Sequence, residues 1–302
     1  MALSAFKDYL QLEKKYSPQT VKAYYRDLAS FSGFCKATYD TGDIKDVNYS
    51  QIRSWIVHLS ARQLSNRSIN RKIASLKAYY KFLLKAGQIT VNPLARHTAL
   101  KTARKIEIPF SEKEMQNVLQ ETDFEDNFEG RRNKLIIELL YATGIRRNEL
   151  VNIKTEDIQL TEKTLKVLGK RNKERIVPLL PVLVNHIREY LILREEIRTE
   201  SSEGYLFLLK NGNKIYDALV YRIINAYFSK VSTKVKKSPH IIRHTFATHM
   251  LGQGADLNAV KELLGHASLA STQVYTHNSV SELKKIHTQA HPRNREGLKR
   301  EK

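Results

Sequence analysis

Two short stretches near the end of the chain carry side chains that could do chemistry on a phosphate. In "KSPHIIRHTFATHML", His240, Arg243 and His244 stand at i, i+3 and i+4, so a helix would place all three on one face. In "LGHASLASTQVYTH", Tyr275 follows His266 by nine residues. A guanidinium directs two donors at phosphate oxygens, an imidazole can pass a proton, and a tyrosine hydroxyl can act as a nucleophile. Each residue taken alone is equally well explained by packing or ion pairing.

A metal site is the competing interpretation of the two histidines four residues apart. The stretch lacks the glutamate of an HExxH zinc motif, and Arg243 between the histidines would repel a cation. Cys35 is the single cysteine of the chain, which excludes a cysteine-rich zinc site and an intramolecular disulfide. The pattern therefore favours an anion as ligand, and we expect neither a metal nor another cofactor.

The charge of the chain indicates a polyanionic partner. Its 302 residues include 51 Lys and Arg against 31 Asp and Glu, a formal net charge of +20. Residues 1–107 are the denser part, with 19 basic and 7 acidic side chains. Such a field attracts nucleic acid, although charge that only keeps a protein soluble is the alternative. The predicted DNA contacts in this part lie on one basic helix: Arg67, Arg71 and Lys72.

No stretch of the sequence predicts a membrane-spanning segment or a signal peptide for export. No apolar run reaches the roughly 20 residues that cross a bilayer. The beginning, "MALSAFKDYLQLEKK", lacks the basic-then-apolar order of a signal peptide. We expect a cytoplasmic protein with no membrane partner.

The first hundred residues have the periodicity of helices. Apolar side chains recur at helical spacing over 21–31, 52–59 and 69–83, and a first helix is expected over 3–12. Ser17 and Pro18 suit the N-cap and first position of the second helix, and Gly87 suits the end of the fourth. The sequence predicts a four-helix domain over 1–98, followed by a basic linker over 99–108.

Residues 109–302 are expected to be mostly helical around a small antiparallel sheet. Ser111 and Glu114 have the spacing of a capping box, and Ser238 with Pro239 can start a later helix. Three short runs, "DIQL", "TLKVL" and "RIVPL", are separated by turns and predict a three-stranded meander. The second turn, "GKRNKE", contains three cations, each able to reach DNA: Lys170, Arg171 and Lys173.

Six residues of the chain, in order over about 130 positions, resemble the active-site set of the tyrosine recombinases, the phage integrase family. The set consists of Arg146 in "TGIRRNEL", Lys170 in the turn, His240 and Arg243 in "HxxR", His266 in "LGH", and Tyr275. "SPQTVKAYYRDL" resembles the N-terminal core-binding, SAM-like domain of the same family, and "IHTQAHPR" is similar to the ending of the Xer recombinases. Isoleucine at 145, where the family more often has leucine, and the charged tail "NREGLKREK" depart from the pattern without touching the chemistry.

The resemblance implies a site-specific recombinase, and elementary chemistry agrees with it. Transfer of a phosphodiester to the Tyr275 hydroxyl keeps the bond energy in a 3′-phosphotyrosyl linkage. Arg146 and Arg243 can neutralise the phosphoryl oxygens in the transition state without a metal. Lys170 is the expected acid for the departing 5′ oxygen, and His240 can accept the tyrosine proton.

The remaining residues of the set are expected to support these four. His266 adds a hydrogen bond to the phosphate. Glu149, a supporting residue by resemblance, is expected to orient Arg146 or the turn rather than to do chemistry itself.

The resemblance also implies how the protein assembles. Strand exchange between two duplexes needs four protomers, identical or paired with a second related recombinase, that pass through a Holliday junction, and an accessory activator is conceivable. Val280, Leu283, Ile286 and Ala290 predict an amphipathic C-terminal helix. We expect it to dock on a neighbouring protomer, with docking on its own domain as the alternative.

Four functions remain open at this point. The first is Xer-type resolution of chromosome dimers. The second keeps the same chemistry but serves a mobile element, as an integrase or resolvase. The third is a basic DNA-binding protein without catalysis, and the fourth a metal-dependent nuclease or transposase, which would need clustered carboxylates that the motifs lack.

Overall fold

The computed structural model describes residues 2–103, 107–121, 124–169, 173–265 and 277–294. Contacts divide the chain into two compact units, 1–106 and 107–302. The mainly helical fold with one small antiparallel sheet confirms the predicted fold class. No helix in the described ranges combines the length and the apolar character needed to cross a bilayer.

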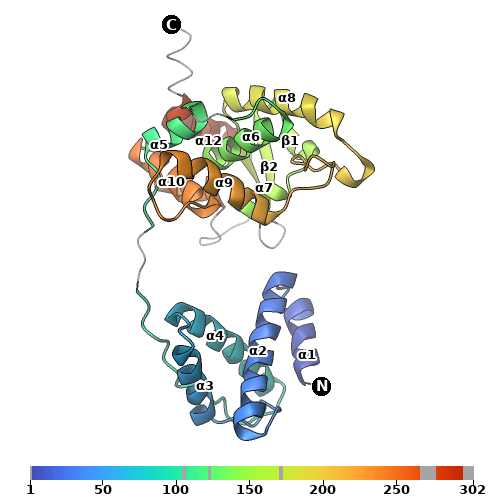
Figure 1. Ribbon diagram of the computed structural model, residues 1–302, viewed down its shortest axis with the longest axis vertical. Coiled ribbons are helices and arrows are strands. Elements are labelled where there is room, and N and C mark those ends of the chain that lie inside the picture. Colours follow the sequence, from blue (N-terminus) through green and yellow to red (C-terminus); the bar gives the residue numbers. More distant parts are fainter. Residues whose placement is uncertain (1, 104–106, 122–123, 170–172, 266–276, 295–302) are drawn as a thin grey trace. The chain divides into compact units, whose positions relative to one another are not determined.

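Unit 1 is a bundle of helices (Figure 1) around a core of aliphatic and aromatic side chains. Ser17 caps the second helix by accepting a hydrogen bond from the Thr20 amide at 3.3 Å, as its position before Pro18 predicted. Phe31 and Trp55 meet in the core with ring centroids 4.9 Å apart. The elements are α1 (Ala2–Asp8), the π-helical turn η1 (Tyr9–Glu13), α2 (Pro18–Tyr39), α3 (Tyr49–Ala61) and α4 (Asn66–Lys85).

The chain that leaves unit 1 stays attached to α4 beyond the residue where we expected the linker to begin. Asn70 exchanges two hydrogen bonds with the backbone of Leu100, at 2.8 and 2.9 Å, and Asn66 donates to the Lys101 carbonyl at 2.7 Å. Side-chain amides thus satisfy backbone groups that have no helical partner. Residues 99–101 of the predicted linker are therefore part of this unit.

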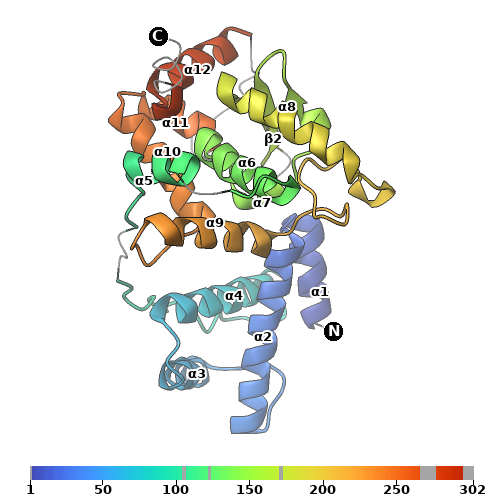
Figure 2. The same cartoon turned by 45° about the horizontal axis from the view of Figure 1, so that its top comes forward.

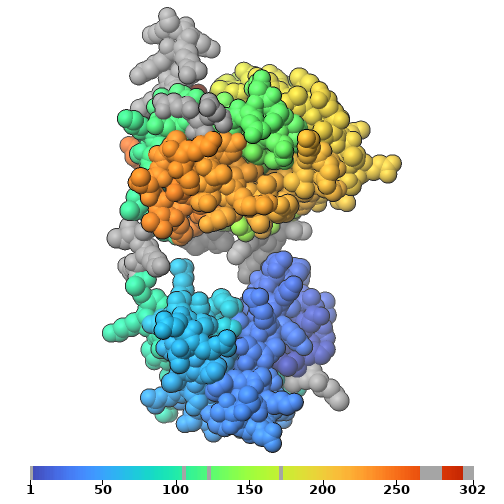
Figure 3. All heavy atoms as spheres, viewed as in Figure 1, coloured from blue at the N-terminus to red at the C-terminus, as the bar shows by residue number. Residues whose placement is uncertain are grey.

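Unit 2 is built around one helix that is buried along most of its length. In α6 (Phe128–Thr143) every residue from Leu135 to Thr143 is buried, and the helix packs between α8 (Pro181–Glu196) and α10 (Pro239–Gly252) (Figure 2). In the space-filling view, α9 (Asp217–Val231) and α10 form much of one face, in orange (Figure 3). The remaining elements are α5 (Glu112–Gln116), η2 (Asn117–Glu121), α7 (Arg147–Val151), η3 (Thr155–Asp157), η5 (Glu200–Ser202), α11 (Leu257–Leu264) and α12 (His277–Ala290).

The sheet of unit 2 has the meander topology that the sequence predicted. It runs β1 (Ile158–Gln159), β2 (Thr164–Leu168) and β3 (Glu174–Pro178), in the order β1-β2-β3 with antiparallel pairing. Val167 pairs with Arg175 and Leu165 with Val177, and all four side chains are buried on the same face. A charged side chain therefore sits in the apolar row of the sheet.

The C-terminal helix α12 packs on its own unit, through Leu283 and Ala290, each 5% exposed. His287 and His291 are fully buried, and their Nε2–H groups donate to carbonyls of α6, at 2.6 Å to Ala142 and 3.2 Å to Tyr141. The described part of its apolar face is thus covered by its own domain within one chain, and docking on a neighbouring protomer stays a prediction. The side chain of Val280 lies outside the described residues.

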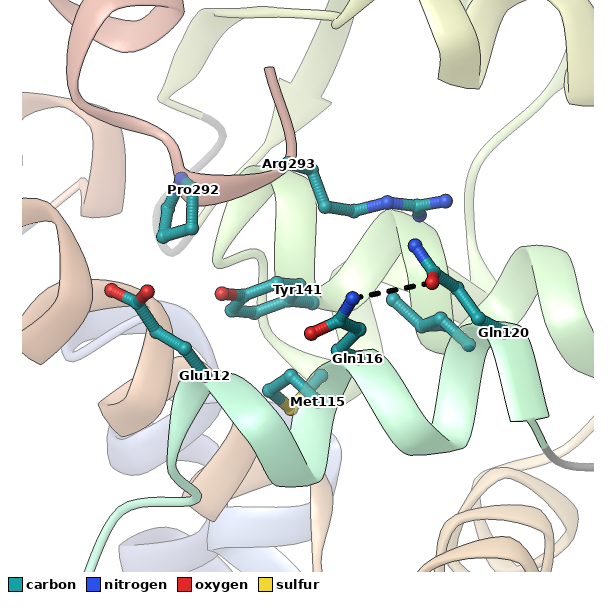
Figure 4. A pocket seen from close by; sticks show the side chains of 8 residues that line it. Glu112, Met115, Gln116, Gln120, Tyr141, Pro292 and Arg293 are labelled. Carbon is teal, nitrogen blue, oxygen red and sulfur yellow. Dashed lines mark hydrogen bonds between the residues drawn. The ribbon is translucent and has the colours of Figure 1, made fainter. Parts of the chain in front are cut away.

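The segment after α12 continues this docking across the surface of α5. Figure 4 shows Pro292 and Arg293 on one side of a small pocket, opposite Met115 and Gln116, with Tyr141 at its base. The Arg293 guanidinium reaches the buried carboxylate of Glu138 at 2.9 Å. The end of the described chain is therefore anchored by a charged pair as well as by apolar contacts.

Candidate active site

Arg146 stands at a sharp turn between two helices. Helix α6 ends at Gly144, which has a φ of +60°, and a Cβ there would lie 2.4 Å from the Phe246 ring, so only glycine fits. Arg146 follows as the N-cap residue of α7. The carboxylate of Glu149 accepts hydrogen bonds from the backbone amide and from Nη1 of Arg146, both at 2.7 Å. These two bonds orient the Arg146 guanidinium.

Arg243 comes from α10 and reaches the same turn. Its Nη1 donates to the Gly144 carbonyl at 2.6 Å and its Nη2 to the Leu264 carbonyl at 2.7 Å. Arg146 Nη2 donates to the adjacent carbonyl, that of Gly265, at 3.2 Å. The structure thus brings Arg146 and Arg243 together at the end of α11, immediately before His266.

Burial, and then the charge of Arg146, lower the pKa of Arg243 to about 10. The guanidinium is still protonated at neutral pH. The backbone carbonyls hold the two guanidiniums close together. The positive charge concentrated there suits an anion with two or more oxygens.

His240 lies in the first turn of α10, whose start is capped by Ser238 as predicted. Its side chain is 72% exposed, and its Nε2 is 3.2 Å from Oε2 of Glu107. His244 is also exposed, whereas Arg243 is buried, so the three residues of the expected common face differ in accessibility. Ile242, Phe246 and Met250 enter the core from another face of the helix.

Four of the predicted site residues lie outside the described residues: Lys170, Arg171, His266 and Tyr275. The residues around them are described. The Gly169 amide donates to the Lys173 carbonyl at 2.8 Å and closes the β2–β3 turn, with Lys173 exposed. Gly265, with a φ of +64°, ends α11 directly before His266. Helix α12 begins two residues after Tyr275.

Arg175 is the residue of this region that the sequence did not reveal. Its Nη1 and Nη2 donate to the two oxygens of Glu149 at 3.0 and 2.8 Å, and its Nε donates to the Leu263 carbonyl at 3.0 Å. The available signal was its position in the strand. Arg175 stands two residues before Val177, so both side chains lie on the same, inward face, and a charged side chain there needs a buried partner.

The predicted DNA contacts of unit 1 are exposed to different degrees. Arg67 is exposed on α4. Arg71 and Lys72 both bind the fully buried carboxylate of Asp27, at 2.5 and 3.1 Å, and Ser75 donates to it at 2.9 Å. The Arg71 side chain stays 49% exposed, but that of Lys72 only 15%. Asp27 therefore offsets part of the positive charge that the sequence placed on this face.

Among the described residues, no cluster of three or more His, Cys, Asp or Glu side chains could hold a metal ion. The charged groups that converge at the end of α11 are arginines around the single carboxylate of Glu149, an arrangement that fits a phosphate rather than a cation. The chemistry that this region can support is therefore stabilisation of negative charge on a phosphoryl group.

The chain matches known families over both units. Residues 110–282 match the Phage integrase family, and residues 3–87 match the Phage integrase N-terminal SAM-like domain. It is 39% identical over 295 residues to tyrosine recombinase XerC of Pelobacter propionicus, covering 97% of this chain and 96% of that protein. With tyrosine recombinase XerC of Chlorobaculum parvum it is 36% identical over 315 residues, covering 96% and 94%.

Solved structures show the same fold at lower identity. A XerH site-specific recombinase bound to palindromic difH substrate has a TM-score of 0.69 and 21% identity, with 98% of this chain and 83% of that chain covered. The Tn1549 transposon integrase in complex with transposon right-end DNA has a TM-score of 0.69 and 18% identity, covering 94% and 98%.

Fold and sequence thus define an enzyme of site-specific recombination. The chain belongs to the phage integrase family, the tyrosine recombinases, as its six-residue motif set indicated. The curated relatives named here are Xer-type recombinases, and they match it over nearly the full length.

Proposed function

We propose that the chain cuts and rejoins duplex DNA at a specific site through a covalent bond between Tyr275 and a 3′ phosphate. The tyrosine oxygen attacks the phosphorus, the bond to the 5′ oxygen breaks, and that oxygen leaves as a hydroxyl after taking a proton. A 5′ hydroxyl of the partner strand reverses the step. No energy source is consumed because one phosphodiester bond is exchanged for another.

The observation that carries this proposal is the convergence of Arg146 and Arg243 on adjacent carbonyls at the end of α11. Two guanidiniums held at one place supply the positive charge that the phosphoryl oxygens require as the tyrosine attacks. Two of the carbonyls that anchor them belong to Leu264 and Gly265, the residues that precede His266 in the chain. His240 contacts the same phosphate from the first turn of α10 and takes the tyrosine proton.

The other predicted residues keep supporting roles in this proposal. Lys170 protonates the 5′ oxygen, and His266 donates a hydrogen bond to the phosphate. Arg67, Arg71 and Lys72 on α4, with Arg171 and Lys173 in the β2–β3 turn, contact the DNA backbone. The core-binding domain comprises residues 1–98 together with residues 99–101 of the predicted linker, which are attached to α4, and residues 109–302 form the catalytic domain.

The biological role that we propose is Xer-type resolution of chromosome dimers, carried out by four protomers, alone or with a second related recombinase, through a Holliday junction. The supporting observation is the near full-length similarity to XerC proteins. Service to a mobile element is the second candidate. Mapping the sites that the protein occupies in its cell separates the two: a single chromosomal site supports the first, and sites at the ends of an element support the second.

The covalent step is tested with a nicked duplex that carries the mapped site, on which cleavage releases a short fragment and traps the adduct. Wild-type protein is expected to yield a DNA adduct that resists denaturant, with chelator present. Tyr275→Phe removes only the hydroxyl and is expected to bind the duplex with unchanged affinity and to form no adduct. Tyr221→Phe, at an exposed tyrosine of α9, is the matched control and keeps full activity. An adduct formed by the Tyr275→Phe variant refutes the assignment of the nucleophile.

A further inference from the structure

Arg175 occupies an unusual place for a charged side chain. It belongs to the inward row of the sheet, opposite Val167, and its side chain is 5% exposed. All three of its nitrogens donate: two to the carboxylate of Glu149 and one to the backbone of α11. The residue is therefore fixed by its bonds as well as by its packing.

Arg175 also lies against the glycines that precede two of the predicted catalytic residues. A Cβ built on Gly265, the residue before His266, would lie 3.1 Å from Cδ and Nη1 of Arg175. A Cβ built on Gly169, the residue before Lys170, would lie 3.8 Å from Nη1. Gly169 and Gly265, the last described residues before Lys170 and His266, thus both lie beside this guanidinium.

The third connection passes through Glu149. One carboxylate serves two guanidiniums: Oε1 accepts from Arg146 at 2.7 Å and from Arg175 at 3.0 Å, while Oε2 accepts from the Arg146 amide and from Arg175. Burial raises the pKa of Glu149, but its bonds to Arg175 and Arg146 outweigh that effect and hold the pKa below its ordinary value. Glu149 is therefore ionised, and Arg175 takes up part of its charge.

Without Arg175, the single carboxylate would turn wholly to Arg146. A bidentate pair with Glu149 would draw Arg146 Nη2 from the Gly265 carbonyl and cancel the positive charge that the phosphate needs. With Arg175 present, two guanidiniums bind one carboxylate and the charge of Arg243 lies close by, so the site keeps an excess of positive charge.

We propose that Arg175 is a positioning residue of the recombinase: it holds Glu149, and with it the Arg146 guanidinium, and it supports the chain just before Lys170 and His266. This rests on the proposed function, because it assigns Arg175 to the same phosphate site. It does not touch the phosphate itself.

The first test compares Arg175→Met with Arg194→Met. Arg194 is the matched control because it is also buried, at 2% exposed, and donates to backbone carbonyls of Tyr205 and Leu206 away from the site. On the nicked duplex with the mapped site, Arg175→Met is expected to slow adduct formation at saturating protein by a factor on the order of 10², while the dissociation constant changes less than about tenfold. Arg194→Met is expected to stay within about threefold of wild type in rate, at a temperature where both variants are folded.

Two further variants keep the test decisive if Arg175→Met folds poorly. Arg175→Lys retains the charge but not the fork of donors, and it is expected to recover part of the rate. The double variant Glu149→Gln/Arg175→Met is expected to lose less rate than the product of the two single effects, since residues that share a contact are not additive.

The outcomes separate this inference from the function on which it rests. If the wild type forms no adduct, both are overturned. If the wild type forms one while Arg175→Met and Arg194→Met lose rate equally, or the double variant loses the full product of the two single effects, only the positioning role is overturned.

Discussion

Nε2 of His240 lies 3.2 Å from Oε2 of Glu107, so a carboxylate of the same chain holds the imidazole that we propose to contact the scissile phosphate. Lys236 also donates to Glu107, and that bond is the main reason why the pKa of Glu107 lies below its ordinary value, with His240 contributing further. Glu107 is therefore ionised at neutral pH. A phosphate that binds His240 must compete with it.

The first prediction follows from this competition: Glu107→Gln should bind DNA more tightly than wild type. An ion pair between exposed groups is worth little, so the expected gain is about two- to fivefold in the dissociation constant at low salt, and less as salt screens the charges. Fluorescence anisotropy with a labelled duplex measures it. Glu203→Gln removes an equal charge from an exposed loop of the same unit and controls for net charge. Equal gains in both variants would show that the Glu107 pair has no specific effect.

The second prediction concerns the buried carboxylate of unit 1. Asp27 accepts from Arg71, Lys72 and Ser75, so Asp27→Asn leaves two cations without their partner. Removal of one member of a buried pair costs about 3–5 kcal/mol, and the half-exposed Arg71 places the expected loss in the free energy of unfolding near the lower limit, about 3 kcal/mol.

Trp55 makes this loss measurable for unit 1 alone. It is the single tryptophan of the chain and is 1% exposed in the core of that unit, so its fluorescence during urea unfolding reports unit 1. Asp40→Asn is the matched control, because Asp40 is exposed and its left-handed backbone suits asparagine. An unfolding midpoint for Asp27→Asn equal to that of the control would contradict a stabilising role for the buried carboxylate.

The third prediction is that the catalytic unit loses stability as the pH falls from about 6.5 toward 4. Burial, opposed by the bond to the Ala142 carbonyl, lowers the pKa of His287 to about 4, and burial followed by the charge of His287 lowers that of His291 as well. Both imidazoles donate from Nε2, and Nδ1 of His287 finds no partner among the described residues. A proton at that atom would therefore be buried without an acceptor.

The sign of the effect follows from the lowered pKa values. The unfolded chain binds protons that the folded chain excludes, so the stabilisation is complete above pH 6.5 and declines below it. The expected loss for His287 is roughly 2 kcal/mol by pH 5, or a fall in melting temperature of about 4–8 °C.

His287→Gln/His291→Gln keeps the donors but does not titrate, so its melting temperature should vary less with pH than that of wild type. His244→Gln, at an exposed histidine, should keep the wild-type slope, and parallel slopes in all three proteins would exclude the buried pair as the cause.

Local signals in the sequence predicted the elements, whereas the contacts between distant segments required the structure. The capping box of Ser111 and Glu114 and the three short strands were predicted because their partners lie within a few residues. Asp27 was missed although its spacing from Tyr24 and Phe31 places it beside the apolar stripe of its helix. Arg175 was missed because its partner Glu149 is 26 residues away, and alternation alone does not show which face of a strand is buried.

The last prediction concerns Lys170, whose role depends on what the leaving group needs. An alkoxide leaving at neutral pH needs a proton, whereas a thiolate, with a pKa of about 8.5 in free cysteine, largely does not. Lys170→Ala should cleave ordinary DNA more slowly by a factor on the order of 10² to 10⁴, and a duplex with sulfur in place of the bridging 5′ oxygen should restore most of that rate.

Lys173→Ala is the matched control, because Lys173 is exposed in the same turn and its backbone closes that turn with Gly169. Its small defect should be the same on both duplexes, as expected for a contact with the DNA backbone. Rescue of Lys173→Ala instead of Lys170→Ala would assign the acid to the other lysine, and rescue of neither would show that the turn only binds phosphate and that the acid lies elsewhere.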